Sequence, residues 1–326
     1  MADNITGPYR DAIGRALVAN NQIDPTVWID DDGQAYLMWG NPDLYYAKLN
    51  PDMISISGQP VKISLTTQGF GARRSGSNSR ATAYEEGPWI YKRNGKYYLI
   101  YAANCCSEDI RYATAPTITG PWTYGGLVMA TAGASFTNHP AIIDFNGTSY
   151  FFYHNGALPG GSGYTRSVAV ESFKYNSDGS IPTISMTTKG PAQIGSLDPY
   201  VRQEAETMAF SSGLKTEVSS EGGIDVTQIS NGDYIKVAGV AFGDGAKTFS
   251  ARVASSTSGG KIEVRVGSQS GTLVATCTVA GTGGNQKWTT VTCPVSGASG
   301  KQDLFFKFTG GSGVLFNFDW WQFSKA

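Results

Sequence analysis

The sequence predicts an all-β protein made of two domains. The chain has 326 residues, a length more typical of two domains than of a single core. Only 16% of its residues are charged, whereas 41 are glycine and 12% are aromatic. This balance favours short strands joined by glycine turns over amphipathic helices.

Charge and hydropathy argue against two classes of partner. The formal net charge is −1 and lysine and arginine do not cluster, so the chain lacks the basic surface that binds nucleic acid or an acidic membrane. No apolar run approaches the length of about 18 residues that a membrane span needs. Residues 1–21 have neither a basic start nor an apolar stretch and do not read as a signal peptide.

Three segments of the first 200 residues share one plan, which is a strand, a polar glycine turn and an aromatic strand. They are DPTVWIDDDGQAYLMWG (24–40), EGPWIYKRNGKYYLIYA (86–102) and NHPAIIDFNGTSYFFYH (138–154). Their turn glycines, Gly33, Gly95 and Gly147, follow one another at spacings of 62 and 52 residues. Such spacings suit four-stranded blades, so this half is predicted to be a β-propeller.

The three segments also share a polar position. Asp24, Glu86 and Asn138 each stand nine residues before the turn glycine. A polar residue before a strand is often only a turn or a cap, as Asp24 before a proline would be on its own. In a propeller this position opens the innermost strand, and innermost strands converge on the axis. Three polar residues in register therefore favour a site in one funnel.

An aspartate and a glutamate in one funnel suit glycoside hydrolysis. That reaction needs a carboxylic acid to protonate the leaving oxygen and a carboxylate to activate water or attack. A phosphate-binding Gly-Lys-Ser/Thr loop is missing from the sequence, and two histidines leave few ways to build a zinc or Ser-His site. Sugar chemistry is the class of reaction that fits the residues best.

These residues resemble glycoside hydrolase family 43, five-bladed propeller enzymes that act on arabinan, xylan and arabinoxylan. The resemblance covers nearly all of residues 1–198. Its motifs are IDPTVWIDDDG, YEEGPWIYKRNGKYYLIY, TITGPWTYGG, SFTNHPAIIDFNGTSYFFYHNG and GYTRSVAVESFKYNSDGSIP. The combination of these motifs is specific, although each motif alone is short.

The resemblance assigns roles to the residues of the funnel. It makes Glu86 the general acid and Asp24 the carboxylate that keeps the acid protonated by like-charge repulsion and orients it. Glu85 is expected to point the other way. Asn138, His139 and Arg166 are expected to face the substrate, with His139 in the central channel near a bound cation or its waters. For His139 alone, a satisfied core histidine would be the ordinary interpretation.

The resemblance also implies that part of the propeller lies upstream. The outer-strand motif ITGPW at 118–122 has a counterpart, ITGPY, at 5–9. Residues 1–198 therefore correspond to a propeller without its first blade and most of its second. In the family the general base is an aspartate of that first blade. We expect the base and any signal peptide to lie outside this chain, and the chain alone to be inactive.

The second domain is predicted to be a β-sandwich of the jelly-roll type over residues 202–326. It shows short alternating strands rich in small residues. It resembles carbohydrate-binding module family 6 in EAE (204–206), NGDYIKVAGVAFG, GGKIEVRVGS, QKWTTVTCPVSGASG and LFNFDWWQF.

This second resemblance implies a sugar site and a metal site. Tyr234 and Trp288 would sandwich one sugar, and Asn317 would bond its hydroxyls, as aromatic faces and amides suit pyranose rings. A single aromatic residue such as Trp288 would otherwise be read as core packing. The implied ligands of a structural calcium are Glu204, Glu206 and Asp319, which without the family would read as surface charges.

The four cysteines form two pairs. Cys277 and Cys293 lie on strand-like runs around a glycine-rich turn, which could bring both sulfurs together across a ladder. A disulfide there indicates an oxidising compartment. Cys105 and Cys106 are adjacent, and we expect buried thiols or, as the alternative, a vicinal disulfide.

The sequence thus predicts a secreted, inverting glycosidase that acts on arabinoxylan or xylan, with a calcium-containing module that binds xylan. We expect an α-L-arabinofuranosidase, because a xylan anchor suits an enzyme that removes side chains from the polymer. The alternatives are a β-xylosidase and, since the general base is not found in this chain, a carbohydrate-binding protein without catalysis.

Overall fold

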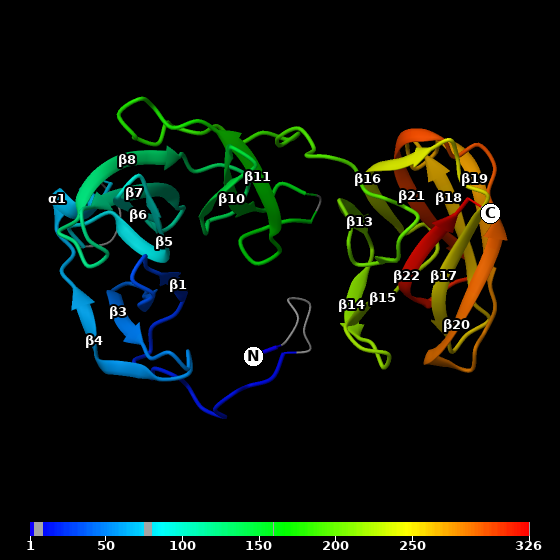
Figure 1. Cartoon of the computed structure of the whole chain (residues 1–326), viewed down its shortest axis with the longest axis horizontal. Helices are drawn as coiled ribbons and strands as arrows, with labels where there is room; N and C mark the ends of the chain where they lie inside the picture. The colour runs from blue at the N-terminus through cyan, green and yellow to red at the C-terminus, as the bar shows by residue number, and fades with distance from the viewer. Residues whose placement is uncertain (3–8, 75–79, 159, 326) are drawn as a thin grey trace. The chain divides into compact units, whose positions relative to one another are not determined.

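The computed structural model describes residues 1–2, 9–74, 80–158 and 160–325. Most of the ITGPY motif at 5–9 lies outside these residues. Within the described part the only α-helix is the single turn α1 (Thr67–Phe70), and all other named elements are strands. The chain divides into two compact units, one of residues 11–191 and one that contains residues 192–325 (Figure 1). The division falls slightly earlier than the sequence suggested, because Leu197 is hydrogen-bonded to Gly239 and Ala241 of the second unit.

The first unit contains three antiparallel sheets that follow one another along the chain, coloured blue, cyan and green in Figure 1. The first sheet consists of β1 (Thr26–Ile29), β2 (Ala35–Trp39), β3 (Leu44–Leu49) and β4 (Ile56–Ile63). The second consists of β5 (Tyr84–Arg93), β6 (Lys96–Ala103), β7 (Asp109–Ala115) and β8 (Thr123–Met129). The third consists of β9 (Ala141–Phe145), β10 (Thr148–Asn155) and β11 (Ser167–Phe173). Each sequence repeat supplies the first hairpin of one sheet.

The turns of these hairpins explain the glycines that anchor the repeat. Asn94 and Gly95 connect β5 to β6, and Asn146 and Gly147 connect β9 to β10, all four with positive φ. Two residues with positive φ form the turn that matches the twist of an antiparallel pair, and Asn-Gly adopts it most readily. The repeated motif therefore predicts a hairpin as well as a propeller blade.

Alternation along β6 holds the three sheets together. Leu99 and Tyr101 are buried in a core shared with the first sheet, which includes Met38. Ile100, one residue along, is buried in a second core with Phe151 of the third sheet. Because successive side chains of a strand point to opposite faces, one strand packs against both neighbouring sheets. This packing holds β1, β5 and β9, the first strands of the three sheets, in place relative to one another.

The second unit is a sandwich of two antiparallel sheets. One sheet has the order β14 (Lys215–Val218), β15 (Ile224–Thr227), β22 (Asn317–Ser324), β17 (Thr248–Ser255) and β20 (Gly284–Pro294), with β12 (Gln203–Glu204) also paired to β22. The other has the order β13 (Phe210–Ser212), β16 (Tyr234–Gly243), β21 (Gly300–Gly310), β18 (Gly260–Val266) and β19 (Thr272–Val279).

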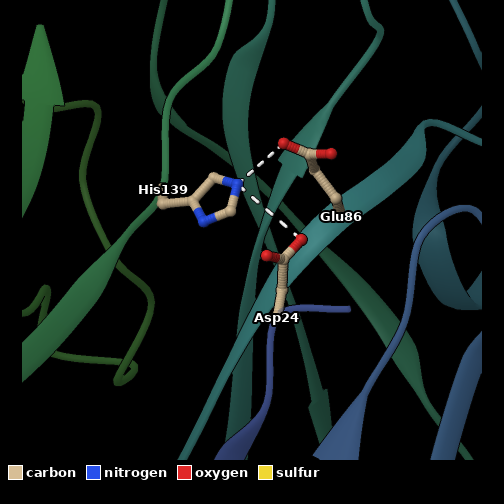
Figure 2. A group of neighbouring side chains, drawn as sticks. All are labelled: Asp24, Glu86 and His139. Atoms are coloured by element: carbon tan, nitrogen blue, oxygen red, sulfur yellow. Dashed lines mark hydrogen bonds and ion pairs between the residues drawn. The ribbon is translucent and has the colours of Figure 1, made fainter. Parts of the chain in front are cut away.

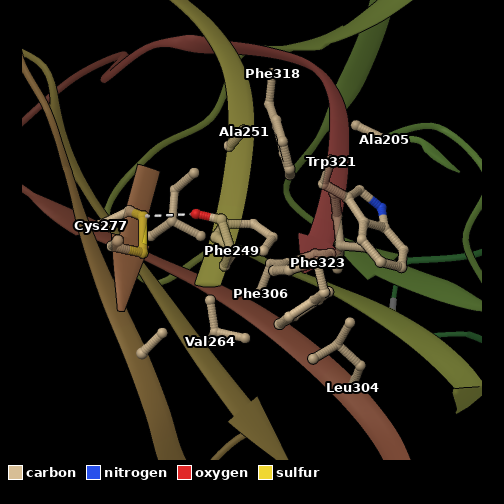
Figure 3. Close-up of a cluster of buried hydrophobic side chains, with 14 of the residues drawn as sticks. Ala205, Phe249, Ala251, Val264, Cys277, Leu304, Phe306, Phe318, Trp321 and Phe323 are labelled. Atoms are coloured by element: carbon tan, nitrogen blue, oxygen red, sulfur yellow. Dashed lines mark hydrogen bonds between the residues drawn. A yellow bond between two sulfur atoms is a disulfide. The ribbon is translucent and has the colours of Figure 1, made fainter. Parts of the chain in front are cut away.

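Aromatic rings fill the space between the two sheets (Figure 3). Phe249, Phe306 and Trp321 are fully buried and come from both sheets. The disulfide between Cys277 and Cys293 has Cα atoms 5.4 Å apart. It joins β19 to β20, which are edge strands of different sheets, so it links the two sheets instead of crossing one ladder. Cys105 and Cys106, expected first as thiols, are joined as a vicinal disulfide.

Candidate active site and carbohydrate-binding cluster

Asp24, Glu86 and His139 meet although they are far apart in the sequence (Figure 2). Asp24 precedes β1, Glu86 lies at the start of β5, and His139 precedes β9. His139 Nε2 is 2.7 Å from Glu86 Oε1 and 3.9 Å from Asp24 Oδ2. The three potential ligand atoms lie within 4.8 Å of one another. The shared position of the repeats thus brings the two predicted carboxylates together.

The third repeat contributes its histidine to this cluster rather than its asparagine. The Asn138 side chain is buried, and its Oδ1 has no hydrogen-bond partner. Its backbone N–H donates to Glu108 Oε2 at 2.8 Å. A pocket of about 500 Å³ is lined by Ile23, Asp24, Glu86, His139, His154, Arg166, Ser167 and Val168, without Asn138. A contact between Asn138 and a substrate therefore stays a prediction, whereas Arg166 does line the pocket.

The backbone around Glu86 is shaped to present its side chain. The pairing of β5 with β6 shifts register on both sides of Glu86, and such irregularities re-aim a side chain. Gly87 follows with a φ of 58°, and a Cβ atom on it would lie 3.1 Å from Cγ of His139. Glycine therefore allows both the turn of the chain and the close approach of the imidazole ring.

Glu85 and Glu86 contact different groups, as the sequence suggested. Glu85 is buried and pairs with Arg73 at 2.9 Å and with Arg80. Glu86 has both carboxyl oxygens engaged on the pocket side, one by His139 and the other by the side-chain amide of Asn41. No sequence pattern indicated Asn41, which follows β2 outside the repeated position.

Burial and like charges perturb the titration of the cluster. Burial raises the pKa of Asp24, and the nearby charge of Glu86 adds to this effect while His139 opposes it. Burial alone would lower the pKa of His139, but the hydrogen bond with Glu86 and the charge of Asp24 raise it overall. Asp24 Oδ2 is buried without a hydrogen-bond partner. The pocket thus places Asp24, whose pKa burial raises, beside the Glu86 carboxyl group, which contacts an imidazole and an amide.

Two further titratable groups, Glu108 and His154, interact electrostatically with the cluster, and neither was predicted from the sequence. Glu108 is almost fully buried, and burial followed by the charge of Glu86 raises its pKa to about 8. His154 lies 5.7 Å from His139 between ring centroids. Burial and then the charge of Arg166 lower the pKa of His154 to about 4. His154 ends the aromatic strand of the third repeat, where the other repeats have glycine and alanine, and that difference was the available signal.

The expected sugar site of the sandwich is only partly assembled. Tyr234 belongs to β16 and Trp288 to β20, which lie in different sheets, so the sandwiching of one sugar between the two rings stays a prediction. Tyr234 instead packs near Phe210 and Phe305, at 6.0 and 6.3 Å between ring centroids. Trp288 donates from Nε1 to Ser220 Oγ at 3.1 Å.

Asn317 is fully buried, and its amide is engaged within the protein. Its Nδ2 donates to Glu217 Oε1 at 2.6 Å and to Asp225 Oδ1 at 3.0 Å. Its Oδ1 accepts from the Thr227 hydroxyl at 3.1 Å. Direct bonding of Asn317 to a sugar, as expected, would require one of these contacts to give way. Glu217 and Asp225 were not identified from the sequence.

The three carboxylates expected to bind calcium interact electrostatically, and two of them have an unpaired buried oxygen. Among the described residues, however, only Asp24, Glu86 and His139 bring three potential ligand atoms within 4.8 Å of one another, so this calcium site stays a prediction. Arg202 lies 2.9 Å from Glu204 and 3.7 Å from Asp319. Glu206 Oε2 and Asp319 Oδ2 are buried and have no hydrogen-bond partner. Burial, then the charges of Glu204 and Asp319, raises the pKa of Glu206 to about 7. Unpaired carboxylate oxygens that repel one another fit a hard cation.

Comparison with known families agrees with this geometry. Residues 1–181 match the family model of glycosyl hydrolases family 43. The chain belongs to this family. Residues 204–325 match the model of carbohydrate binding module (family 6). The family assignment therefore covers the unit with the Glu86 cluster, and the module assignment covers the sandwich.

Two curated relatives are similar to this family 43 chain along nearly all its length. The arabinoxylan arabinofuranohydrolase of Bacillus subtilis is 38% identical over 373 residues, covering 99% of this chain and 69% of the relative. That of Paenibacillus polymyxa is 34% identical, covering 99% of this chain and 55% of the relative. The chain thus spans only part of each relative.

A solved structure agrees with the fold. A family 43 arabinoxylan arabinofuranohydrolase from Bacillus subtilis, in complex with cellotetraose, matches with a TM-score of 0.82 and 35% identity, covering 100% of this chain and 73% of that chain. Among the described residues, no helix is long and apolar enough to cross a membrane.

Proposed function

We propose that this chain belongs to an enzyme that removes arabinofuranosyl side chains from arabinoxylan by inversion, with a C-terminal module that binds xylan. The observation that carries the proposal is the Glu86 carboxyl group, which lies in a pocket with His139 on one oxygen and Asn41 on the other. The names of the two curated relatives support the choice of arabinoxylan.

Glu86 acts as the general acid and Asp24 as its modulator. A protonated Glu86 gives its proton to the glycosidic oxygen as the sugar leaves. Asp24 lies close by, and its carboxylate stabilises the positive charge that develops on the sugar. His139 orients the acid through its 2.7 Å contact. Arg166 lines the same pocket and is placed to contact a sugar hydroxyl.

The spacing of the carboxylates argues against Asp24 as the water-activating base. Inverting enzymes keep acid and base roughly 6.5 to 9.5 Å apart so that a water fits between them. Oxygen atoms of Asp24 and Glu86 lie within 4.8 Å. The base is therefore a different group, which we take to be the aspartate that the family carries on its first blade.

Two cation sites accompany this function. Glu204, Glu206 and Asp319 would hold a structural calcium in the sandwich, supported by the two unpaired buried oxygens. A second cation would lie in the propeller channel near His139. We further propose that the protein is secreted, because the inter-sheet disulfide suits an oxidising compartment.

Leaving-group dependence tests the role of Glu86. In this test and the next, the protein assayed carries the general base, because inversion needs a carboxylate that activates water. Glu86→Gln should then lower arabinose release from arabinoxylan by about 10²–10⁴-fold, the usual worth of general acid catalysis. It should lower turnover of an activated aryl arabinofuranoside much less, because that leaving group departs without protonation. Glu263→Gln, on the sandwich, is the matched control and should change neither rate. Equal losses on both substrates would exclude Glu86 as the acid.

Product stereochemistry tests the role of Asp24. Proton NMR of the first-formed sugar should show the inverted anomer. Net retention would make Asp24 a nucleophile and contradict the proposed division of roles.

Faster turnover of aryl xyloside than of aryl arabinofuranoside would favour the alternative β-xylosidase.

A further inference from the structure

The sandwich contains a buried carboxyl group that no assigned role explains. Asp225 lies on β15 and is fully buried. Its Oδ1 accepts from Asn317 Nδ2 and its Oδ2 from Gln286 Nε2, each at 3.0 Å. The same two amide nitrogens donate to Glu217 Oε1 at 2.6 and 3.0 Å. Two carboxylates therefore share two amide donors.

This network continues to the aromatic ring at the module surface. Gln286 Oε1 accepts from the backbone N–H of Ser220 at 2.7 Å. Ser220 Oγ in turn accepts from Trp288 Nε1 at 3.1 Å. Asp225 is thus connected to Trp288 through one side-chain amide and one serine, and to Asn317 directly.

We propose that Asp225 is a positioning residue of the xylan-binding site, which holds the buried amide of Asn317 and the amide of Gln286 and, through Gln286 and Ser220, positions the ring of Trp288. The inference rests on the proposed sugar binding by this module. An amide has a donor end and an acceptor end, and only one orientation of Asn317 satisfies Asp225 on one side and the Thr227 hydroxyl on the other. The carboxylate thereby selects that orientation.

The surroundings of Asp225 disfavour its charged form. Burial raises its pKa to about 6, and the charges of Glu217 and Asp319 add to this effect, whereas the Gln286 and Asn317 hydrogen bonds oppose it. Glu206 is a further carboxyl group within electrostatic range. When Asp225 takes up a proton below about pH 6, it loses part of its capacity to accept, and the two amides are held less firmly.

The test uses the full chain with Asp225→Asn and titration calorimetry with xylohexaose. Asparagine offers one oxygen to two amide donors, so either Asn317 or Gln286 loses an acceptor whichever way the new side chain turns. We expect about tenfold weaker binding near neutral pH, the effect of losing one charged hydrogen bond. Wild-type affinity should fall between about pH 7.5 and about pH 5, whereas the variant should change little.

Two controls separate Asp225 from other carboxylates. Glu217→Gln removes the neighbouring carboxylate and should keep a pH dependence that is moved to lower pH, because a charge that raises the pKa of Asp225 is lost. Asp303→Asn removes a carboxylate from the other sheet, where it pairs with Lys236, and should keep both affinity and pH dependence. Wild-type affinity in Asp225→Asn, or a pH dependence that survives in it, would overturn the inference.

If circular dichroism shows that Asp225→Asn does not fold, the pH dependence of xylohexaose binding by the wild type decides whether the inference holds. Unchanged wild-type affinity between about pH 7.5 and about pH 5 would overturn the inference while the proposed binding function stands. Absence of xylohexaose binding by the wild type would overturn the proposed binding function and this inference together.

Discussion

The charge of Asp24 acts on its neighbours even without a substrate. It is one of the interactions that raise the pKa of His139. Asp24→Asn should therefore lower that pKa, because the imidazolium loses a nearby negative charge. The chain has two histidines, so an NMR titration follows His139 and His154 separately. The pKa of His154 responds to the charge of His139 and should change less, and an unchanged titration of His139 would contradict the electrostatic coupling.

Glu108 should make stability depend on pH. Its pKa is about 8 in the folded protein and near 4.5 when exposed, so the folded state binds the proton more tightly. The stability that this provides is complete at low pH and is lost as the pH rises through about 8. Glu108→Gln cannot ionise, and its melting temperature should exceed that of the wild type by a margin that grows from about pH 5 to about pH 8. A constant margin would mean that Glu108 does not titrate in this range.

At the scale of single residues, the repeat position predicted two of its three residues as members of the site, whereas the third, Asn138, does not line the pocket. Asp24 and Glu86 could be placed in one funnel because hairpin geometry repeats. Asn41 and Glu108 could not be placed, since each comes from a loop beside its strand and no periodicity marks it. Asp225 could not be singled out either, because the amides that contact it come from two other strands, β20 and β22.

The turn after Glu86 can be tested as an element. Gly87→Ala places a Cβ atom against the His139 ring at a backbone φ of 58°. We expect a loss of stability of about 1–3 kcal/mol and a displaced His139, seen as a changed NMR titration. Gly95→Ala is the matched control, because its φ is 74° and no atom lies within 4 Å of the added Cβ. Both variants bear backbone strain, and only Gly87→Ala should disturb His139; equal His139 titrations in the two would contradict the steric argument.

Secondary structure was easier to predict than the pairing of strands. The hairpins of the second and third repeats follow from Asn-Gly turns, that of the first from an Asp-Gly turn, and all three from aromatic alternation, which are local signals. The assignment of β16 and β20 to different sheets is a long-range property, and it separated Tyr234 from Trp288. The disulfide expected across a ladder likewise links two sheets, because β19 and β20 are consecutive in the chain but lie in different sheets.

At the scale of the whole molecule, composition and motif order predicted two all-β units and their families. The limit between the units was less predictable. Residues 192–198 have no strand periodicity, yet Gln193 donates to the Ala238 carbonyl at 2.9 Å, and Leu197 is hydrogen-bonded to Gly239 and Ala241. Such contacts of an irregular segment leave no pattern in the sequence.

The two units have separate hydrophobic cores, and their disulfides should affect them separately. The bond between Cys277 and Cys293 spans 16 residues within the sandwich. Closing a loop of that size stabilises a folded domain by about 3 kcal/mol, mainly by restricting its unfolded chain. The double variant Cys277→Ser, Cys293→Ser should therefore lower the sandwich transition by several degrees in calorimetry and leave the propeller-unit transition in place. The matched control is Cys105→Ser, Cys106→Ser, which should change only the propeller-unit transition. If either pair shifts both transitions equally, the units unfold as one cooperative body and their cores do not act independently.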